Sequence, residues 1–277
     1  MLKIRPTAFA AILAIVSLSC VSSLAQAESG LDRIVKSGTL RCGVMLDSPP
    51  SGFRNAQNEP DGFDVTYCKD MAAALNVKAE IVETPSPQRI PALVSKQIDI
   101  AISSMSNTVA RGLTVAFSQP YMNYTNSVLT RKDAGIAKFE DMKGHKLGGV
   151  NGTSTEQALQ GFIKDWNDAK TTYTGYASDS DSFLALKQGK IDAIISATAN
   201  AASLMQSGQF PEFTVAGLVP TPPDLVAMAV PRGDQEFLNW VKLFIWNQVK
   251  SGRFQAVYNM YFGPGDAPSL TIGGVDY

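Results

Sequence analysis

The chain of 277 residues carries 24 Lys and Arg against 25 Asp and Glu, which gives a formal net charge of −1. This balance offers no basis for a nucleic-acid partner, which requires clustered positive charge. With 45% apolar residues, the chain can build a packed core in one large domain or in two lobes.

Residues 1–27 have the pattern of a cleaved signal peptide. A basic start is followed by an apolar run over residues 8–18, which is too short to span a bilayer, and then by an A-x-A cleavage site at residues 25–27. In the alternative, Cys20 would carry a lipid anchor, but the residues before it match the lipidation pattern poorly. We therefore expect an exported protein that begins near Glu28.

Short apolar runs alternate with segments of helical periodicity along the rest of the chain. The first set has predicted strands at 39–45, 79–84, 98–103 and 115–117, and predicted helices at 67–75 and 90–95. The second set has predicted strands at 146–150, 171–176 and 193–196, and predicted helices at 155–167, 180–188 and 199–207. Strands that alternate with helices form mostly parallel sheets, so two such sets predict two α/β lobes.

Two cysteines, Cys42 and Cys68, remain after removal of the signal peptide. Export to an oxidising compartment favours a disulfide between them, because a strand and the helix that follows it pack together. The alternative is a pair of buried thiols. The single histidine, His145, is far away in sequence, so we expect neither a metal site nor a cofactor.

The segment that ends in Arg111 predicts a binding site for a carboxylate. It follows the apolar run at residues 98–102 and places Ser104 and Ser106 upstream of the arginine. A guanidinium donates two parallel hydrogen bonds to a carboxylate, and ligands bind where the strands of open α/β sheets end. The alternative is an ordinary loop with a surface arginine.

A second anion site is predicted at Gly152-Thr153-Ser154, which lies between a predicted strand and a predicted helix. The free N–H groups at the start of a helix favour negative charge. Plain helix capping is the alternative, because Ser154 and Gln157 have capping-box spacing.

Several short strings together resemble the periplasmic solute-binding proteins of the polar amino-acid ABC-uptake type. They are Gly38–Val44, Gly62–Val65, Arg89–Leu93, the segment from Ser104 to Tyr121, Gly152–Ser154, Gly189–Ala193 and the stretch from Tyr258 to Phe262. Each string is weak by itself, but their order and spacing over residues 31–262 carry the resemblance.

The resemblance implies a type II periplasmic-binding-protein fold, with two α/β lobes joined by two crossing strands that act as a hinge. Lobe 1 would comprise residues 28–126 and 229–277, and lobe 2 would comprise residues 127–228. The crossings are expected near 127–131 and 225–230. A ligand bound in the cleft would close the lobes, and the closed form would dock on a membrane permease. A monomer is expected.

The resemblance also implies roles for individual residues. Arg111 would bind the carboxylate of the ligand together with Ser104 and Ser106, and the loop at residues 152–154 would close over it. Phe53 would pack on the ligand. Arg89 would pair with a second carboxylate, which favours an acidic amino acid.

One position departs from the family pattern. Many members carry an aspartate five residues after the Asp of the Gly-x-Ile-Asp string to hold the ammonium group, and here that residue is Ala197. Asp179 and Asp181 are candidate substitutes, although they also have the position of helix N-caps. Ligand identity is therefore open between a polar amino acid and a related small carboxylate.

Two other functions compete with transport. A dehydratase of cyclic carboxylates on the same fold would need a general acid near the cleft, and no histidine or paired carboxylates stand at the cleft motifs. A sensor that reports to a membrane receptor would look the same in sequence. We expect a binding protein and not an enzyme.

Overall fold

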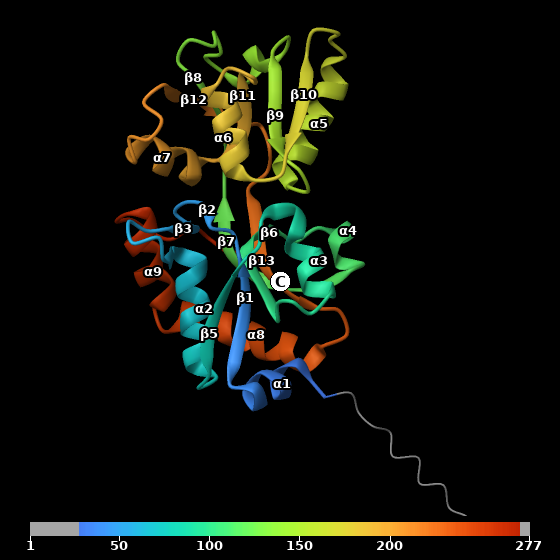
Figure 1. Cartoon of the computed structure of the whole chain (residues 1–277), viewed down its shortest axis with the longest axis vertical. Coiled ribbons are helices and arrows are strands. Elements are labelled where there is room, and N and C mark those ends of the chain that lie inside the picture. The colour runs from blue at the N-terminus through green and yellow to red at the C-terminus, as the bar shows by residue number, and fades with distance from the viewer. Residues whose placement is uncertain (1–27, 272–277) are drawn as a thin grey trace, which may run out of the picture.

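The computed structural model describes residues 28–271, so the predicted signal peptide lies outside the described residues. The chain forms two α/β lobes stacked along the long axis of the molecule, each built on a five-stranded sheet (Figure 1). The predicted two-lobed α/β architecture is confirmed. Within the described residues, no helix is both long enough and apolar enough to cross a bilayer.

The first sheet has the strand order β5-β1-β6-β13-β7. Its strands are β1 (Thr39–Val44), β5 (Lys78–Glu83), β6 (Ile100–Ser106), β7 (Val115–Tyr124) and β13 (Asp224–Pro231). The strands β5, β1 and β6 are parallel, whereas β13 runs antiparallel to both β6 and β7. The helices of this lobe are α1 (Gly30–Ser37), α2 (Phe63–Ala74), η1 (Ser86–Gln88), α3 (Arg89–Val94), α4 (Val109–Gly112), α8 (Gln235–Lys250) and α9 (Arg253–Phe262).

The second sheet repeats this pattern in the order β10-β9-β11-β8-β12. Its strands are β8 (Asn126–Arg131), β9 (Lys146–Val150), β10 (Thr172–Tyr176), β11 (Ala193–Ala197) and β12 (Phe213–Leu218). Three strands are again parallel, and β8 runs antiparallel to β11 and β12. The helices are η2 (Phe139–Met142), α5 (Ser154–Trp166), α6 (Asp179–Lys187) and α7 (Thr198–Gln206).

A small third sheet lies where the first lobe faces the second (Figure 1). It consists of β2 (Asp47–Ser48), β3 (Gly52–Arg54) and β4 (Pro60–Asp61), which pair antiparallel. The sheet follows directly after β1, so it places polar residues at the junction of the two lobes.

The lobes are joined by two short crossings. The first is Thr125, between the end of β7 at Tyr124 and the start of β8 at Asn126, and the second covers residues 219–223. Both segments expected as crossings are strands within a sheet, since β8 pairs only in the second sheet and β13 only in the first. The second crossing therefore lies upstream of Asp224.

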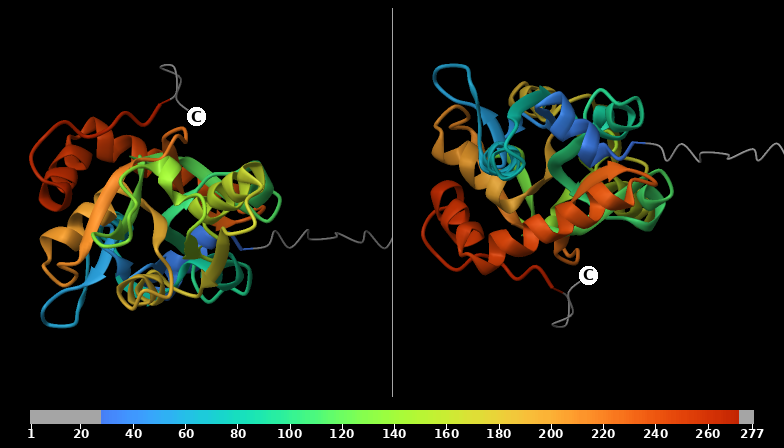
Figure 2. Two further views of the ribbon diagram at one scale, coloured as in Figure 1. Left: turned by 90° about the horizontal axis from the view of Figure 1, so that it is seen from above. Right: turned by 90° about the horizontal axis from the view of Figure 1, so that it is seen from below.

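The C-terminal part of the chain packs on the first lobe. The apolar side of α8 supplies Phe237, Val241, Phe244 and Ile245 to the same buried cluster as β1 and α2. Seen from below, α8 runs across the base of this lobe beside α1 (Figure 2). The first lobe is thus assembled from two separated stretches of chain.

The predicted disulfide is confirmed. Cys42 on β1 and Cys68 on α2 are bonded, with their Cα atoms 6.2 Å apart, and both are wholly buried. The helix α2 lies against the strand that precedes it, as the alternation of strand and helix predicted. The bond fixes one face of the first sheet to its covering helix.

Candidate functional site

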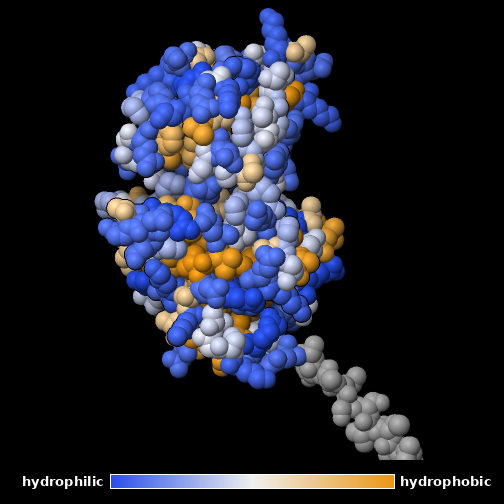
Figure 3. Space-filling view, in the orientation of Figure 1, coloured by the Kyte–Doolittle hydropathy of each residue, from blue (hydrophilic) through white to orange (hydrophobic). Residues whose placement is uncertain are grey.

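A cavity of about 90 Å³ lies between the two lobes. Since one water needs roughly 10–15 Å³ by this measure, the cavity has room for about six waters or one small molecule. In the space-filling view the lobes touch along a waist (Figure 3), so the cleft is closed. Its walls carry many hydroxyl groups, among them those of Ser48, Ser86, Ser104, Ser106, Thr153, Ser154, Thr155 and Ser196.

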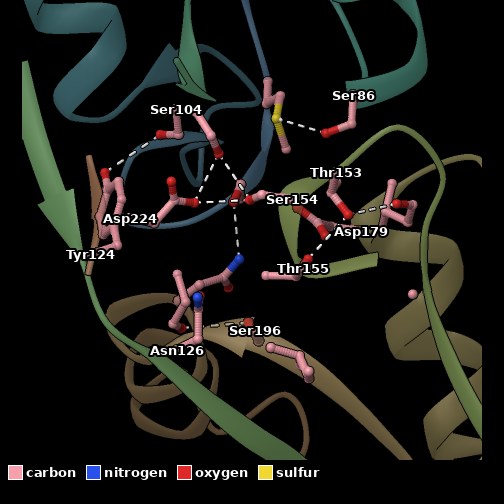
Figure 4. A pocket seen from close by; sticks show the side chains of 18 of the residues that line it. Ser86, Ser104, Tyr124, Asn126, Thr153, Ser154, Thr155, Asp179, Ser196 and Asp224 are labelled. Carbon is pink, nitrogen blue, oxygen red and sulfur yellow. Dashed lines mark hydrogen bonds between the residues drawn. The ribbon is translucent and has the colours of Figure 1, made fainter. Parts of the chain in front are cut away.

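A carboxylate already lies between hydroxyls of opposite lobes. The Oγ atoms of Ser106 on β6 and Ser154 on α5 are 2.8 Å apart, and they lie 2.8 and 2.9 Å from Oδ2 of Asp224 (Figure 4). These three contacts share two hydroxyl protons. Asp224 begins β13, directly after the second crossing. Two of the predicted site residues are thus brought together around a carboxylate, although this carboxylate belongs to the protein.

Arg111 lies behind this cluster and is not among the residues that line the cavity. Its guanidinium donates to the carbonyl of Ser106 at 2.8 Å and to the carbonyl of Gly152 at 2.7 Å. Burial lowers the pKa of Arg111, and the negative charge of Asp224 opposes this effect. The arrangement differs from the predicted direct contact, because two backbone carbonyls from different lobes already use N–H groups of the guanidinium.

Arg89 is the arginine that lines the cavity, and its side chain is 4% exposed. It donates to the carbonyls of Ser86 at 3.1 Å and Ser103 at 2.7 Å. Burial lowers the pKa of Arg89 to about 10, which leaves it charged at neutral pH. Arg89 therefore supplies a buried positive charge to the wall of the cavity.

Ser104 lines the cavity with its backbone in the left-handed region, at φ 47°. The hydroxyl of Ser104 donates to Asp64, which also accepts from Tyr121, and the N–H of Ser104 donates to Tyr121. Burial raises the pKa of Asp64 to about 7 in spite of these hydrogen bonds. This network holds a strained residue in place beneath the cavity, as is common at functional sites.

The loop from Gly152 to Ser154 begins α5 as predicted, with one change in the cap. Thr153 is the N-cap, and its hydroxyl accepts from the N–H of Glu156, so the cap lies one residue earlier than predicted. Thr153 and Ser154 line the cavity, whereas Gly152 is exposed and contributes its carbonyl to Arg111. The loop contacts the first lobe through the Gly152 carbonyl, which accepts from Arg111, and through the Ser154 hydroxyl, which lies within hydrogen-bond distance of Ser106 and Asp224.

Phe53 does not line this cavity, which contradicts its predicted position. It pairs with Asp47 across β2 and β3, and its ring packs edge-on against Tyr261 at 6.5 Å. The short strands turn the ring toward a different depression, on the outside of the junction. The aromatic residue that lines the cavity is Tyr124, whose hydroxyl lies 2.7 Å from Oγ of Ser51.

The helix α6 brings an acidic side chain, that of Asp179, to the wall of the cavity. Its N-cap is Ser178, so Asp179 is free to line the cavity, whereas Asp181 accepts from the Ser178 hydroxyl. Asp47 in the first lobe accepts from the N–H groups of Asp179 and Ser180, at 2.9 and 3.3 Å. The cap interpretation is therefore wrong for the side chain of Asp179.

Comparison with known proteins agrees with this geometry. The profile of the bacterial extracellular solute-binding proteins, family 3, matches residues 40–264. The chain belongs to this family.

Several known proteins are similar to this solute-binding protein over most of its length. The L-cystine-binding protein of Escherichia coli K12 is 28% identical over 90% of this chain and 92% of its own length. A mutant of the arginine-binding protein of T. maritima has a TM-score of 0.77 at 27% identity, covering 85% of this chain and 100% of that chain. An L-cysteine receptor of Neisseria gonorrhoeae has a TM-score of 0.75 at 28% identity, covering 84% and 93%.

The type II fold and the family predicted from the sequence are therefore confirmed, and the chain is a solute-binding protein of that family. No histidine lines the cavity among the described residues. His145 lies on the second lobe, with Nδ1 3.6 Å from Asp192. Among residues 28–271 no cluster of histidine, cysteine and acidic residues has the form of a metal site.

Several residues of the cavity were missed by the sequence analysis, among them Asp224, Asn126 and Asn200. Asp224 follows Pro222 and Pro223 and has the position of a loop residue, while Asn126 and Asn200 are single polar residues beside apolar runs. Polar side chains flank both crossings, since Asn126 follows the first and Asp224 follows the second. A polar residue next to each crossing could have indicated these cavity residues, but only once the positions of the crossings were known.

Proposed function

We propose that this protein is the periplasmic binding component of an ABC uptake transporter for a small polar amino acid. The protein acts as a monomer: its cleft closes on the ligand, and the closed form delivers the ligand to a membrane permease. Its relatives are named as binding proteins or receptors for cystine, arginine and cysteine, which supports amino acids as the ligand class.

The observation that carries this proposal is the hydroxyl cluster of Ser106 and Ser154 around a carboxylate. The two serines belong to different lobes, so their hydroxyls meet only when the cleft is closed. A carboxylate group of a ligand, bound there with Ser104 and Thr153 nearby, links closure directly to binding. The contacts of Asp224 support this assignment, because they are an example of a carboxylate bound by these two hydroxyls.

Arg111 acts in this proposal through the backbone. By holding the carbonyls of Ser106 and Gly152, it draws together the strand and the loop that carry the two serines. The positive charge behind the cluster favours a carboxylate there as well. Hinge motion takes place at Thr125 and residues 219–223, and lobe 1 closes onto lobe 2 by rotation about these two segments.

Arg89 favours a ligand with a polar or acidic side chain, because its buried positive charge faces the cavity. The volume of about 90 Å³ favours a short side chain in the closed form. An acidic amino acid with a short side chain, such as aspartate, agrees with both features. The proposal is therefore tested with acidic, neutral and basic amino acids together.

The first experiment is a thermal-shift screen of refolded mature protein against the amino acids, opines and small dicarboxylates. A ligand that binds only the folded state at 100 times its Kd adds about 2.7 kcal/mol to the free energy of unfolding. We expect at least one amino acid to raise the midpoint clearly. If no amino acid shifts the midpoint, the proposed ligand class is wrong.

Calorimetry on Arg111→Ala tests the link between the lobes. We expect this variant to lose affinity by at least about a hundredfold, because a charged donor that holds both lobes is removed. The control is Arg54→Ala, which removes an exposed arginine of the first lobe that pairs with Glu83. Full affinity of Arg111→Ala, with the control unchanged, contradicts the role given to Arg111.

A further inference from the structure

The cavity wall carries no acidic side chain at position 197, where many members of the family have an aspartate. Ala197 ends β11 and is the N-cap residue of α7, and it offers no side-chain oxygen. The closed cleft nevertheless brings side-chain oxygen atoms to the cavity wall from three other elements. They belong to Ser48 on β2, Asp179 on α6 and Asn200 on α7.

Asn200 has a buried acceptor that needs a donor. Its side chain is 6% exposed and lines the cavity, and its Nδ2 donates to Oγ of Ser48 at 2.9 Å. Its Oδ1 is buried without a hydrogen-bond partner among the described residues. A buried polar atom is costly when it is left unpaired, so a donor on a bound molecule would offset a penalty already present in the fold.

Asp179 supplies the negative charge next to this acceptor. Ser48, whose Oγ accepts from Nδ2 of Asn200, also lies close enough to Asp179 to favour the charged form of its carboxylate and to oppose the rise of its pKa. The guanidinium of Arg89 contributes only at longer range, because its N–H groups donate to backbone carbonyls of Ser86 and Ser103. A carboxylate can accept more hydrogen bonds than one hydroxyl supplies, which leaves Asp179 able to accept from a cation.

Asp224, the other carboxylate that lines the cavity, lies at the serine cluster that we assign to the ligand carboxylate. Its Oδ2 already lies within hydrogen-bond distance of the hydroxyls of Ser106 and Ser154. These hydroxyls can donate to a carboxylate, as they do to Asp224. The cavity wall therefore presents two kinds of group, the hydroxyls of Ser106 and Ser154 with Arg111 behind them, and the acceptor atoms of Asp179 and Asn200.

We propose that Asp179 and Asn200 form the subsite for the amino group of the ligand, in place of the aspartate that Ala197 replaces. The ligand is then a zwitterion, whose ammonium donates to the carboxylate of Asp179 and to Oδ1 of Asn200. This inference rests on the proposed function, and it names the residues that distinguish an amino acid from a plain carboxylate.

The test compares each amino acid with the analogue that lacks only the α-amino group. The pairs are L-aspartate with succinate, L-cysteine with 3-mercaptopropionate and L-arginine with 5-guanidinopentanoate, measured by calorimetry. We expect the wild-type protein to prefer the amino acid by about tenfold to a hundredfold, as for one charge-assisted hydrogen bond. In Asp179→Asn, which keeps the shape of the side chain, the preference should fall to about one.

Two further variants make the test specific. Asp181→Asn removes the same charge from the same helix, at an exposed residue that bonds to Ser178, and it should keep the preference. Asn200→Leu keeps the branched shape of the side chain without Oδ1, and it should weaken the amino acid several-fold more than the analogue, because the loss of the bond to Ser48 affects both ligands equally. Thermal unfolding of each variant without ligand confirms that it is folded.

The outcomes separate this inference from the proposed function. If an amino acid binds and Asp179→Asn keeps the wild-type preference, the subsite is wrong while the proposed function stands. If wild-type protein binds an analogue as tightly as its amino acid, the ammonium subsite is also overturned. If no amino acid of the full screen binds, the proposed function fails, and the inference fails with it.

Discussion

At the scale of single residues, the site holds two carboxyl groups whose pKa values lie far above the usual range. Burial raises the pKa of Asp64 to about 7, and hydrogen bonds from Tyr121 and Ser104 only partly offset this effect. Burial also raises the pKa of Asp179 to about 7, and the nearby carboxylate of Asp47 adds to the effect. Arg89 faces both groups and favours their charged forms.

These groups predict that the protein without ligand loses stability as the pH rises from about 4 to about 7. An unfolded Asp titrates near pH 3.9, so in this interval the folded chain binds more protons than the unfolded chain, and stability falls with pH. Urea unfolding at pH 5 and pH 8 measures this difference. Asp64→Asn and Asp179→Asn should each reduce it, and Asp181→Asn should not.

A free energy of unfolding that increases from pH 5 to pH 8 would contradict this assignment. A ligand with an ammonium group should partly compensate the loss, because it stabilises the charged form of Asp179. Its stabilising effect should therefore be larger at pH 8 than at pH 5.

The sequence predicted part of the site well, for a physical reason. Serines after a buried strand come to the carboxyl edge of the sheet, where Ser104 and Ser106 line the cavity, whereas Arg111 of the same segment lies behind them. The direction of Phe53 could not be predicted, because it depends on the pairing of β2 with β3. The contact of Arg111 with the carbonyl of Gly152 depends on how the lobes meet, which no local pattern contains.

At the scale of elements, the strands that cross between lobes were the hardest to place. The predicted strand at 115–117 continues as β7 to Tyr124, past Pro120. Proline interrupts a central strand, but β7 is the edge strand of its sheet, and its pairing with β13 shifts register at Pro120. Helices with a regular apolar face, such as α5, were predicted closely: the helix expected at 155–167 is found at Ser154–Trp166, because burial of that face decides its length.

The disulfide between β1 and α2 should stabilise the first lobe. Its sequence separation of 26 residues corresponds to roughly 3.5 kcal/mol of lost chain entropy in the unfolded state. We expect Cys42→Ala/Cys68→Ala to lower the free energy of unfolding by about 3–5 kcal/mol, measured in urea. Alanine is chosen because both sites are wholly buried.

Ligand affinity of the folded double variant should remain within about threefold of wild type, since neither cysteine lines the cavity. A loss of affinity much larger than this at a temperature where the variant is folded would mean that the bond also positions the site.

At the scale of the whole molecule, a few polar contacts hold the closed cleft. They join Ser106 to Ser154, Arg111 to the carbonyl of Gly152, Asp47 to the start of α6 and Ser48 to Asn200. Because these contacts are few and polar, the lobes can separate at low cost. Closure is then sensitive to any group that adds one more bond between them.

Asp224 predicts a gain of affinity on mutation. Its carboxylate lies at the serines that we assign to the ligand carboxylate, so the two negative groups compete. We expect Asp224→Asn to bind the amino acid about tenfold more tightly in calorimetry, the equivalent of about 1.4 kcal/mol. Asp133→Asn, at an exposed position of the second lobe, is the matched control.

A loss of affinity in Asp224→Asn would have the opposite meaning, that this carboxylate itself contacts the ligand. Small-angle scattering of the variant without ligand should show a larger radius of gyration, because one link between Ser106 and Ser154 is weakened.

The strand β13 lies between β6 and β7, although it is the last strand of the chain. The second lobe is one continuous stretch from Asn126 to Leu218, so a chain that emerges amino end first can complete its second sheet before its first. Until Pro231 has followed, β6 and β7 lack their shared neighbour and keep unpaired edges, which are prone to association with other chains. The lobe that starts first in sequence is therefore the one that finishes last.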